Sequence, residues 1–557
     1  MKPKKLFAGV LSFALLLSLV ACGGGSSDST EEKVLSYNNQ QEPPELNSVL
    51  TTTTGSGNVL RHITEGLVTL DENDEPVGGV AESWDISDDK LTYTFHLREG
   101  LKWSNGETVT ANDFKYAWDQ LFTAKVAAPY AGTWVPLFKG GEGWAATASI
   151  TDEDELAAAQ ATVMDEVRAN GYKVIDDNTL EVYLSGPYDY MLGVLAFYNF
   201  NPLNEKGVEE VGGWDKYAKE ADAFVTNGAF TMDEWVHEDK IVMKKNPDYW
   251  QADKVKLDAI EFRSISDANT NLNAFESGEI DIIEINGEQA KTLREKDEIK
   301  VHDFDDGSAW YFEFNNTLPG LKNQKVRKAL TLGFDADTFI KSVILNESTP
   351  ATSFVPTAIV RGEFADKVGD LIQRPTDGNY DEVKALLEEG LAEEGLTLDT
   401  FKPTMITDDT TQAKKIGEFT QEQFKKNLGV TLKVDTMTYK ARIARMQSYD
   451  FDIVFAGWGP DYNDPMTFLD LFVTGNGNNH TRFSNARYDE LVSLARVEAD
   501  TDKRNEYLIE LEQIIADEQP VGHVYNRRKD YLMAEGVTGV VKTAFTDVDL
   551  RFADIEK

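Results

Sequence analysis

The residue types that most often carry catalysis are scattered along this chain. None of its six histidines belongs to an HExxH pair, and no Gly-x-Ser-x-Gly elbow or Walker loop occurs. Residues 140–143 (GGEG) lack the spacing of a dinucleotide fingerprint. Paired carboxylates are inevitable among 96 acidic residues and carry no information. The sequence therefore predicts a protein that is not an enzyme and needs no cofactor or metal, although these absences alone do not exclude catalysis.

The first 22 residues predict export and a lipid anchor. Three lysines precede an apolar run over residues 6–20, which is too short to span a bilayer and is typical of a secretory signal. The run ends in residues 19–22 (LVAC), which resemble the lipobox of bacterial lipoproteins. The resemblance implies cleavage after residue 21 and a diacylglycerol on Cys22; a plain signal peptide is the alternative. As the only cysteine, Cys22 leaves no internal disulfide and, once lipidated, no thiol nucleophile.

The segment behind Cys22 is flexible and hydrophilic. Residues 23–30 (GGGSSDST) are typical of a tether, so we expect a signal over 1–21, a tether over 22–33 and a folded body from residue 34. No other apolar stretch approaches the length of a membrane-spanning helix. We therefore expect the body on the extracytoplasmic face of the cell membrane. The tether, and the lack of aspartate at position 23, favour a Gram-positive surface over a periplasm.

Length and charge restrict the architecture and the partners. A chain of 557 residues exceeds the size at which single cores stop growing, so at least two lobes are expected. The net charge of −41 repels nucleic acid and anionic lipid heads, which excludes them as favoured partners. An acidic, solvated surface explains this charge, and attraction of cationic solutes or peptides is the alternative.

Hydrophobic periodicity predicts a mixed α/β chain. Residues 91–97 (LTYTFHL) and 180–184 (LEVYL) alternate as half-buried strands do. Residues 111–122 predict a helix that is capped by Thr110 and carries Phe114, Trp118 and Leu121 on one face. Further helices are predicted over 384–391 and 413–428, the second ending at Gly429, with a strand over 431–434.

Several segments resemble one known family. They are residues 78–84 (GGVAESW), 98–114 (REGLKWSNGETVTANDF), 226–230 (TNGAF), 245–250 (KNPDYW), 278–281 (GEID), 314–316 (FNN), 326–330 (VRKAL) and 457–465 (GWGPDYNDP). Their succession is similar to that in the peptide, dipeptide and nickel solute-binding proteins of ABC importers, called family 5, and the last segment resembles the oligopeptide-binding branch. The matches follow the family's order over nearly the whole chain after the signal.

The resemblance implies an α/β fold of two lobes, a periplasmic-binding-protein fold (type II-like, cluster C) with a small additional domain on lobe one. Mapped onto this chain, lobe one would comprise 34–64, 186–300 and 529–557, the additional domain 65–185, and lobe two 301–528. Two chain crossings would form the hinge. A ligand that contacts both lobes would favour the closed state.

The resemblance also implies a peptide site. Asp461 matches the family aspartate that binds the ligand's α-ammonium; the less favoured alternative is that an aspartate beside Pro460 caps a turn. Gly457, Trp458 and Gly459 would offer backbone groups to an extended ligand, with Trp458 walling a side pocket. The remaining residues implied at the site are Thr53 and Thr54 from lobe one, Tyr130 near the ligand, and Tyr439 in a pocket wall. For both tyrosines, ordinary core packing is an equal alternative.

The chain departs from the family where enteric members bind the ligand's carboxylate. The corresponding positions, Ala413, Met446 and Phe455, carry no basic side chain. The carboxylate would then be free, absent from the ligand, or bound by Arg442 or Arg445. Longer peptides become plausible for this reason.

The leading hypothesis is a substrate-binding lipoprotein that captures oligopeptides and delivers them, as a monomer, to an ABC permease in the membrane. The same fold could bind a dipeptide, a signalling peptide, a nickel chelate or a glycan. Residues 458–462 (WGPDY) favour peptides, and the scattered histidines disfavour nickel. A surface hydrolase and an adhesin remain as alternatives from other classes.

Overall fold

The structure, a computed structural model, describes residues 32–556 apart from 148–149, 151, 297 and 499. The predicted signal, the lipidation site Cys22 and almost the whole tether lie outside these residues. Among the residues described, no helix combines the length and the apolar character needed to cross a bilayer.

One large mixed sheet forms the framework. Its strands are β1 (Val34–Asn38), β8 (Phe230–Val236), β9 (Lys240–Lys245), β10 (Ala259–Arg263), β11 (Ile282–Ile285), β12 (His302–Phe314), β13 (Thr349–Pro350), β14 (Thr404–Asp408), β15 (Lys433–Met437), β16 (Ile453–Trp458) and β17 (Val521–Met533). They follow the order β15-β14-β16-β12-β17-β11-β1-β10-β9-β8, and β13 pairs with β17 beside this path.

Three smaller sheets accompany it. A four-stranded sheet has the order β4-β5-β7-β6, and two hairpin-like pairs join β2 with β3 and β18 with β19. These strands are β2 (Val68–Leu70), β3 (Pro76–Gly78), β4 (Ala81–Ile86), β5 (Thr92–Leu97), β6 (Tyr172–Asp176), β7 (Thr179–Tyr183), β18 (Val537–Thr538) and β19 (Asp554–Ile555).

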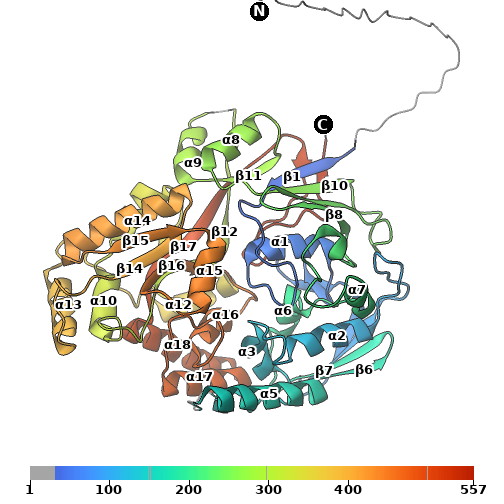
Figure 1. Cartoon of the computed structure of the whole chain (residues 1–557), viewed down its shortest axis with the longest axis horizontal. Helices are drawn as coiled ribbons and strands as arrows, with labels where there is room; N and C mark the ends of the chain where they lie inside the picture. The colour runs from blue at the N-terminus through green and yellow to red at the C-terminus, as the bar shows by residue number, and fades with distance from the viewer. Residues whose placement is uncertain (1–31, 148–149, 151, 297, 499, 557) are drawn as a thin grey trace, which may run out of the picture. The chain divides into compact units, whose positions relative to one another are not determined.

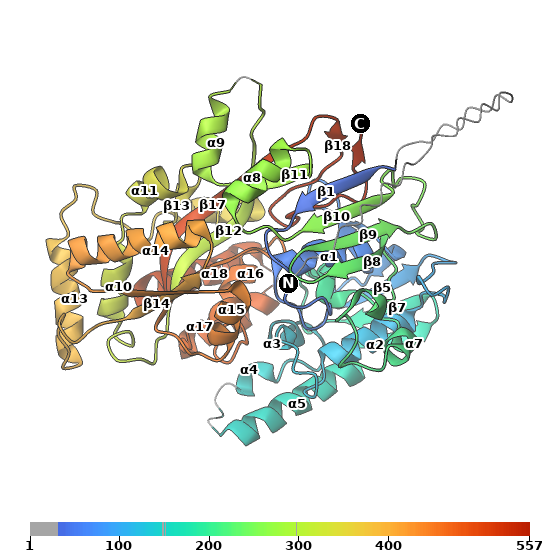
Figure 2. The ribbon, with the colours of Figure 1, turned by 45° about the horizontal axis from the view of Figure 1, so that its top comes forward.

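Helices pack against these sheets. They are α1 (Thr54–Ile63), α2 (Ala111–Leu121), α3 (Ala131–Trp134), α4 (Trp144–Thr147), α5 (Glu153–Asn170), α6 (Met191–Leu195), α7 (Glu205–Glu210), α8 (Ala268–Glu276), α9 (Gly287–Arg294), α10 (Gln324–Leu332), α11 (Ala336–Phe339), α12 (Glu363–Val368), α13 (Asp381–Glu393), α14 (Thr411–Gln423), α15 (Tyr439–Gln447), α16 (Met466–Leu469), α17 (Ala486–Val497) and α18 (Thr501–Glu518). Helix α1 packs on β8 (Figure 2). Helices α2 and α5 pack on β6.

The predicted elements are present, with small shifts at their ends. Strand β5 buries alternate residues, as its period of two predicted. Helix α2 begins after Thr110, whose backbone and side chain both donate to Asp113, in a capping box. The predicted helix over 413–428 is α14 followed by a wider π turn over Phe424–Leu428, and it ends at Gly429 with a φ of 78°. Strand β15 begins two residues later than expected.

Two long strands connect the two parts of the large sheet. β17 pairs with β11 through Asp530–Met533, and with β12 on its other edge between Val521 and Tyr531; β12 in turn pairs with β16. We call the part with β1, β8–β11 and α1 lobe one, and the part with β14–β16 and α15 lobe two (Figure 1). The fold is mixed α/β and two-lobed, as predicted; the exact domain boundaries stay a prediction.

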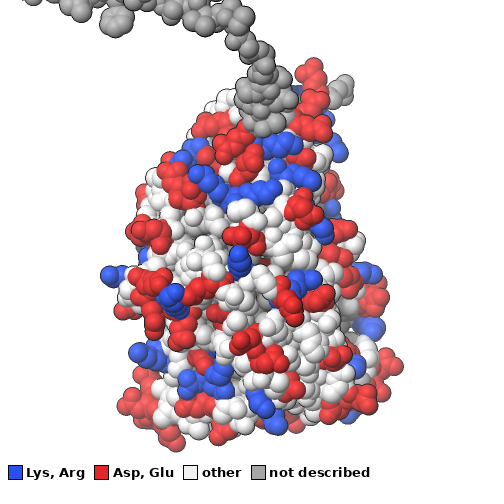
Figure 3. Space-filling model, turned by 90° about the vertical axis from the view of Figure 1, so that its right-hand side faces the viewer, with Lys and Arg blue, Asp and Glu red and all other residues white. Residues whose placement is uncertain are grey.

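The body carries its acidic residues over its surface. On the face shown in Figure 3, acidic side chains extend from one end to the other, with basic side chains among them. This distribution agrees with the net charge of −41.

Candidate functional site

A cavity of about 470 Å³ lies between residues of both lobes. Its volume falls within the range of small-molecule sites, roughly 300–1,000 Å³. The walls come from α1, the loop before α3, residues 193–201, β12, α15, the end of β16 with the residues after it, and the segment around residue 545. All eight residues predicted for the site line this cavity: Thr53, Thr54, Tyr130, Tyr439, Gly457, Trp458, Gly459 and Asp461.

Asp461 presents a carboxylate without a cationic partner. Its backbone N–H donates to Thr467 Oγ1 at 2.9 Å, which fixes the turn after β16. The side chain accepts only from the Tyr130 hydroxyl, at 3.2 and 3.1 Å, and forms no salt bridge in the part of the chain that the structure describes. Burial raises the pKa of Asp461 from 3.8 to about 8, and the Tyr130 hydrogen bond opposes this rise. A cation in the cavity would restore the charged form.

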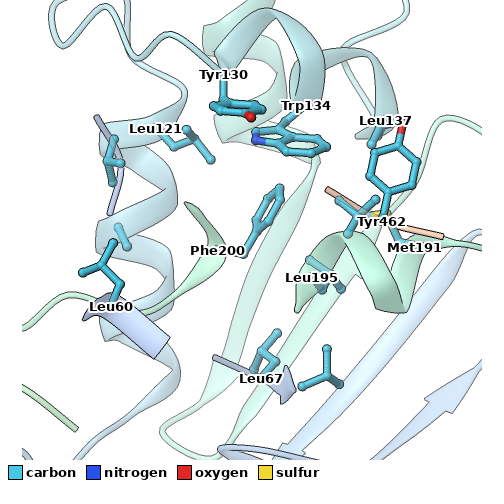
Figure 4. Packing of buried hydrophobic residues seen from close by; sticks show 14 of the residues in the cluster. Leu60, Leu67, Leu121, Tyr130, Trp134, Leu137, Met191, Leu195, Phe200 and Tyr462 are labelled. Atoms are coloured by element: carbon cyan, nitrogen blue, oxygen red, sulfur yellow. The ribbon is translucent and has the colours of Figure 1, made fainter. Parts of the chain in front are cut away.

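Tyr130 is held in place by the aromatic core behind it. Its ring stacks on Trp134 with centroids 5.4 Å apart, and Phe197 contacts it at 5.3 Å. Figure 4 shows Tyr130 and Trp134 above Phe200 in this core. Burial and the Asp461 carboxylate raise the pKa of Tyr130 well above its ordinary value, so the phenol stays protonated and donates. Core packing and cavity contact therefore both apply to Tyr130.

The end of β16 has a free backbone edge toward the cavity. β16 pairs with β12 along its whole length, whereas β14 pairs only with Ile453 and Val454. Gly457, Trp458 and Gly459 line the cavity beyond that point. The close contact that requires glycine at 457 is with the protein itself, since an added Cβ would lie 2.6 Å from Trp310 Cε2. Contact with Trp310 therefore requires glycine at position 457 whether or not a ligand is bound.

Lobe one contributes the start of α1. Thr53 has an extended backbone, and its hydroxyl caps the helix by accepting from the Ser56 N–H at 3.4 Å. The Thr53 carbonyl accepts from the Ser56 and Gly57 N–H groups at 3.1 and 3.0 Å. Because the hydroxyl and the carbonyl are both engaged, the Thr53 N–H is the group left for a ligand. Thr54 follows, and its side chain is exposed. Along the same helix, Asn58 and Arg61 also line the cavity, at the spacing of one helical face.

The basic side chains near α15 differ in what they can reach. Arg442 lines the cavity next to Tyr439, but its Nε donates to Asp408 at 2.7 Å, so an internal carboxylate already neutralises it. Arg445 does not line the cavity and pairs with Asp450 at 3.0 Å. Neither arginine presents a free charge to a ligand.

Asp464, the other aspartate of residues 457–465, has a structural role in the turn before Pro465. It accepts from the Met466 N–H at 2.9 Å and forms a two-fold ion pair with Arg504 at 2.8 and 2.9 Å. It is absent from the cavity wall. Among the residues described, no group of three or more histidine, cysteine, aspartate or glutamate side chains is arranged to hold a metal ion.

Several wall residues were not foreseen from the sequence. They are Arg61, Tyr198, Glu313 and His480. Glu313 Oε2 lies 3.5 Å from His480 Nδ1, and neither atom has a hydrogen-bond partner among the described residues. Arg61 could have been inferred, because it shares a helical face with Thr54 and Asn58 on α1. Glu313 and His480 are far apart in sequence, and no local pattern links them.

Comparisons with known proteins agree with this geometry. The profile described as "Bacterial extracellular solute-binding proteins, family 5 Middle" matches residues 75–480. Oligopeptide-binding protein OppA of Bacillus subtilis is 35% identical over 91% of this chain and 90% of its own length. Dipeptide-binding protein DppE of the same organism is 34% identical over 89% and 87%. Listeria monocytogenes OppA bound to peptide has a TM-score of 0.85 at 31% identity, covering 95% of this chain and 100% of that one.

Two structures of MppA indicate the arrangement of the lobes. The Escherichia coli murein tripeptide binding protein MppA gives a TM-score of 0.83 at 26% identity, covering 95% of this chain and 99% of its own. An unliganded open form of MppA, also 26% identical, gives 0.60 with coverage of 94% and 98%. The lobes of this chain are therefore arranged more as in the peptide-bound OppA than as in the open form, which makes the cavity a closed one. With the matched profile and relatives of this identity, the chain belongs to the bacterial extracellular solute-binding proteins of family 5.

Proposed function

We propose that this chain is the substrate-binding lipoprotein of an ABC importer, which captures oligopeptides between its lobes and delivers them to a membrane permease. The single observation that carries the proposal is the Asp461 carboxylate, which faces the cavity between the lobes with a hydrogen bond from Tyr130 and no cationic partner among the described residues. The names of the relatives OppA and DppE support peptides as the solute.

In the proposal, the α-ammonium of the peptide pairs with Asp461. Two unit charges about 4 Å apart, at an effective dielectric constant near 20, attract by roughly 4 kcal/mol before desolvation is subtracted. The Tyr130 hydroxyl already orients the carboxylate, so little reorganisation accompanies binding. Every peptide with a free N-terminus carries this ammonium, which suits a receptor for varied sequences.

The peptide backbone would add to the free edge of β16. Beyond Val454 this edge has no strand partner among the described residues, and its peptide groups lie at the cavity wall. Recognition through backbone groups is independent of side chains, as in other cases of strand addition. The N–H of Thr53 would contribute from lobe one, and Tyr439 would wall a side pocket. The domain boundaries of the proposal are those predicted from the sequence.

A peptide that contacts both lobes would hold them closed. The free energy available for closure is the difference between its contacts in the closed and the open state. The Tyr130–Asp461 contact joins the loop before α3 to lobe two and would form only on closure. An anchor on Cys22 would keep the receptor at the extracytoplasmic membrane face, beside its permease.

Native mass spectrometry of the protein purified from cells tests this function. We expect masses that exceed the protein by those of short peptides, released on denaturation and sequenced by fragmentation. Retention of a glycan, or slow cleavage of added peptides by the purified protein, would contradict the proposal and favour an adhesin or a hydrolase.

A further inference from the structure

The charged side chains of the cavity are mostly paired within the protein. Three of the four arginines in its wall have carboxylate partners among the described residues. These pairs are Arg442 with Asp408 (2.7 Å), Arg527 with Asp306 (2.7 Å) and Arg551 with Asp549 (2.6 Å). Arg61, the fourth, donates from Nη2 to the Phe545 carbonyl at 3.2 Å and has no carboxylate oxygen within salt-bridge distance in the described part of the chain.

The carboxylates around Arg61 are engaged with other groups. Asp74 accepts from Thr543, and Asp547 accepts from Lys529 and Asn58. Both carboxylate oxygens of Asp549 accept from the Arg551 guanidinium. The guanidinium of Arg551 also lies in electrostatic range of Arg61. Burial and this like charge both lower the pKa of Arg61, while the three carboxylates oppose the shift. An anion in the cavity would act in the same direction as those carboxylates and at closer range.

The position of Arg61 on α1 directs it to the same cavity as Asp461. Arg61 lies two helical turns after Thr54, which corresponds to about 10 Å of helix rise. One turn before it, Gly57 leaves room for the ring of Tyr198, since a Cβ there would lie 2.9 Å from Tyr198 Cε1. The Tyr198 hydroxyl is in electrostatic range of both Asp461 and Arg61, because the first raises its pKa and the second lowers it. Asp461 and Arg61, which have no salt-bridge partners among the described residues, thus both lie in electrostatic range of one hydroxyl.

We propose that Arg61 binds an anionic group of the captured peptide, either its C-terminal carboxylate or an acidic side chain. The inference rests on the proposed function and deepens it, because it supplies the basic side chain that Ala413, Met446 and Phe455 lack. Guanidinium and carboxylate form two parallel hydrogen bonds, and Arg61 has donors free for them. The site then recognises a peptide by both its charges, with Asp461 for the ammonium and Arg61 for the anion.

The test compares peptide pairs by titration calorimetry on the whole mature protein. One pair is trialanine and trialanine amide, which differ only in the terminal charge. The other pairs place glutamate or glutamine at each position of trialanine amide. We expect the wild type to prefer the anionic member of at least one pair by tenfold or more. In Arg61→Gln this ratio falls to about one, while the neutral member keeps its affinity.

Matched controls separate the possible outcomes. Arg445→Gln makes the same change at an arginine outside the cavity and should keep the wild-type ratios. Arg61→Lys retains the charge without the planar fork and should give an intermediate ratio, which decides the matter if Arg61→Gln does not fold. Wild-type ratios near one in every pair, or ratios unchanged in both Arg61 variants, would overturn the inference alone. Failure of the wild type to bind any of these peptides would overturn the proposed function with it.

Discussion

Replacing Asp461 by asparagine should close the empty receptor. In the closed cavity this carboxylate has no cation, so closure without a ligand either buries its charge or takes up a proton. Asparagine has nearly the same shape and no charge, and its amide oxygen can still accept from Tyr130. The substitution therefore removes an electrostatic penalty on the closed, empty state.

The pKa values give the size of this penalty. Asp461 titrates at about 8 in the closed cavity, against 3.8 for a solvated aspartate such as the open state would have. Because closure raises the pKa of Asp461, the free-energy penalty on the closed, empty state is absent below pH 3.8 and grows as the pH rises from 3.8 toward 8. Above pH 8 the penalty is constant. At pH 7 about three pKa units at roughly 1.4 kcal/mol each give about 4 kcal/mol. Water in the cavity screens the charge and reduces this to about 2–4 kcal/mol.

Small-angle scattering of the peptide-free protein measures the effect. A change of about 2–4 kcal/mol raises the closed-to-open ratio by roughly 30- to 700-fold. We expect the radius of gyration of empty Asp461→Asn at pH 7 to approach that of the peptide-bound wild type. The empty wild type should remain more open and should become more compact as the pH is lowered toward 4.5.

Asp450→Asn is the matched control, since Asp450 pairs with Arg445 outside the cavity. It should scatter as the wild type does at every pH. If empty Asp461→Asn is as open as the empty wild type, and the wild type does not compact between pH 7 and 4.5, the reasoning about a penalised buried charge is refuted.

Four further predictions follow from the same geometry. Asp461→Asn should weaken free-amine peptides at least tenfold in calorimetry but N-acetylated ones much less; equal loss for both would remove Asp461 from amine recognition. Wild-type affinity should not rise as the pH is lowered from 7 to 5, since proton uptake by the empty closed state competes with the ion pair, and it should fall above about pH 8 as the peptide amine loses its proton; a maximum at pH 9 would contradict the ion pair. Cys22→Ala should release a soluble protein with unchanged affinity, and continued labelling by radioactive lipid would disprove the anchor. Gly457→Ala should lower the free energy of unfolding by about 1–3 kcal/mol through its contact with Trp310, whereas Gly459→Ala, with a Cβ contact at 3.4 Å, should unfold as the wild type does in thermal denaturation.

Much of the fold follows from local patterns in the sequence. The alternation of β5 and the capped, amphipathic α2 were predictable because side-chain period and capping act over a few residues. The end of the long helix at Gly429 was predictable for the same reason. The π turn before it and the later start of β15 were not, because these details depend on packing against other elements.

The site divides in a similar way. The resemblance to a family pointed to eight residues that all line one cavity, from segments hundreds of residues apart. It did not indicate that Asp408 neutralises Arg442, a pair 34 residues apart, or that Trp310 is the neighbour that requires Gly457. The unpaired charge of Arg61 was invisible in the sequence, because it depends on which carboxylates around it are already engaged by other groups.

A crystal structure of the protein with the ligand that it retains from cells tests the central claim most directly. We predict electron density for an extended peptide along the edge of β16, with its ammonium nitrogen about 2.7–2.9 Å from an Asp461 carboxylate oxygen. A peptide whose N-terminus lies away from Asp461, or a ligand that is not a peptide, would contradict the account.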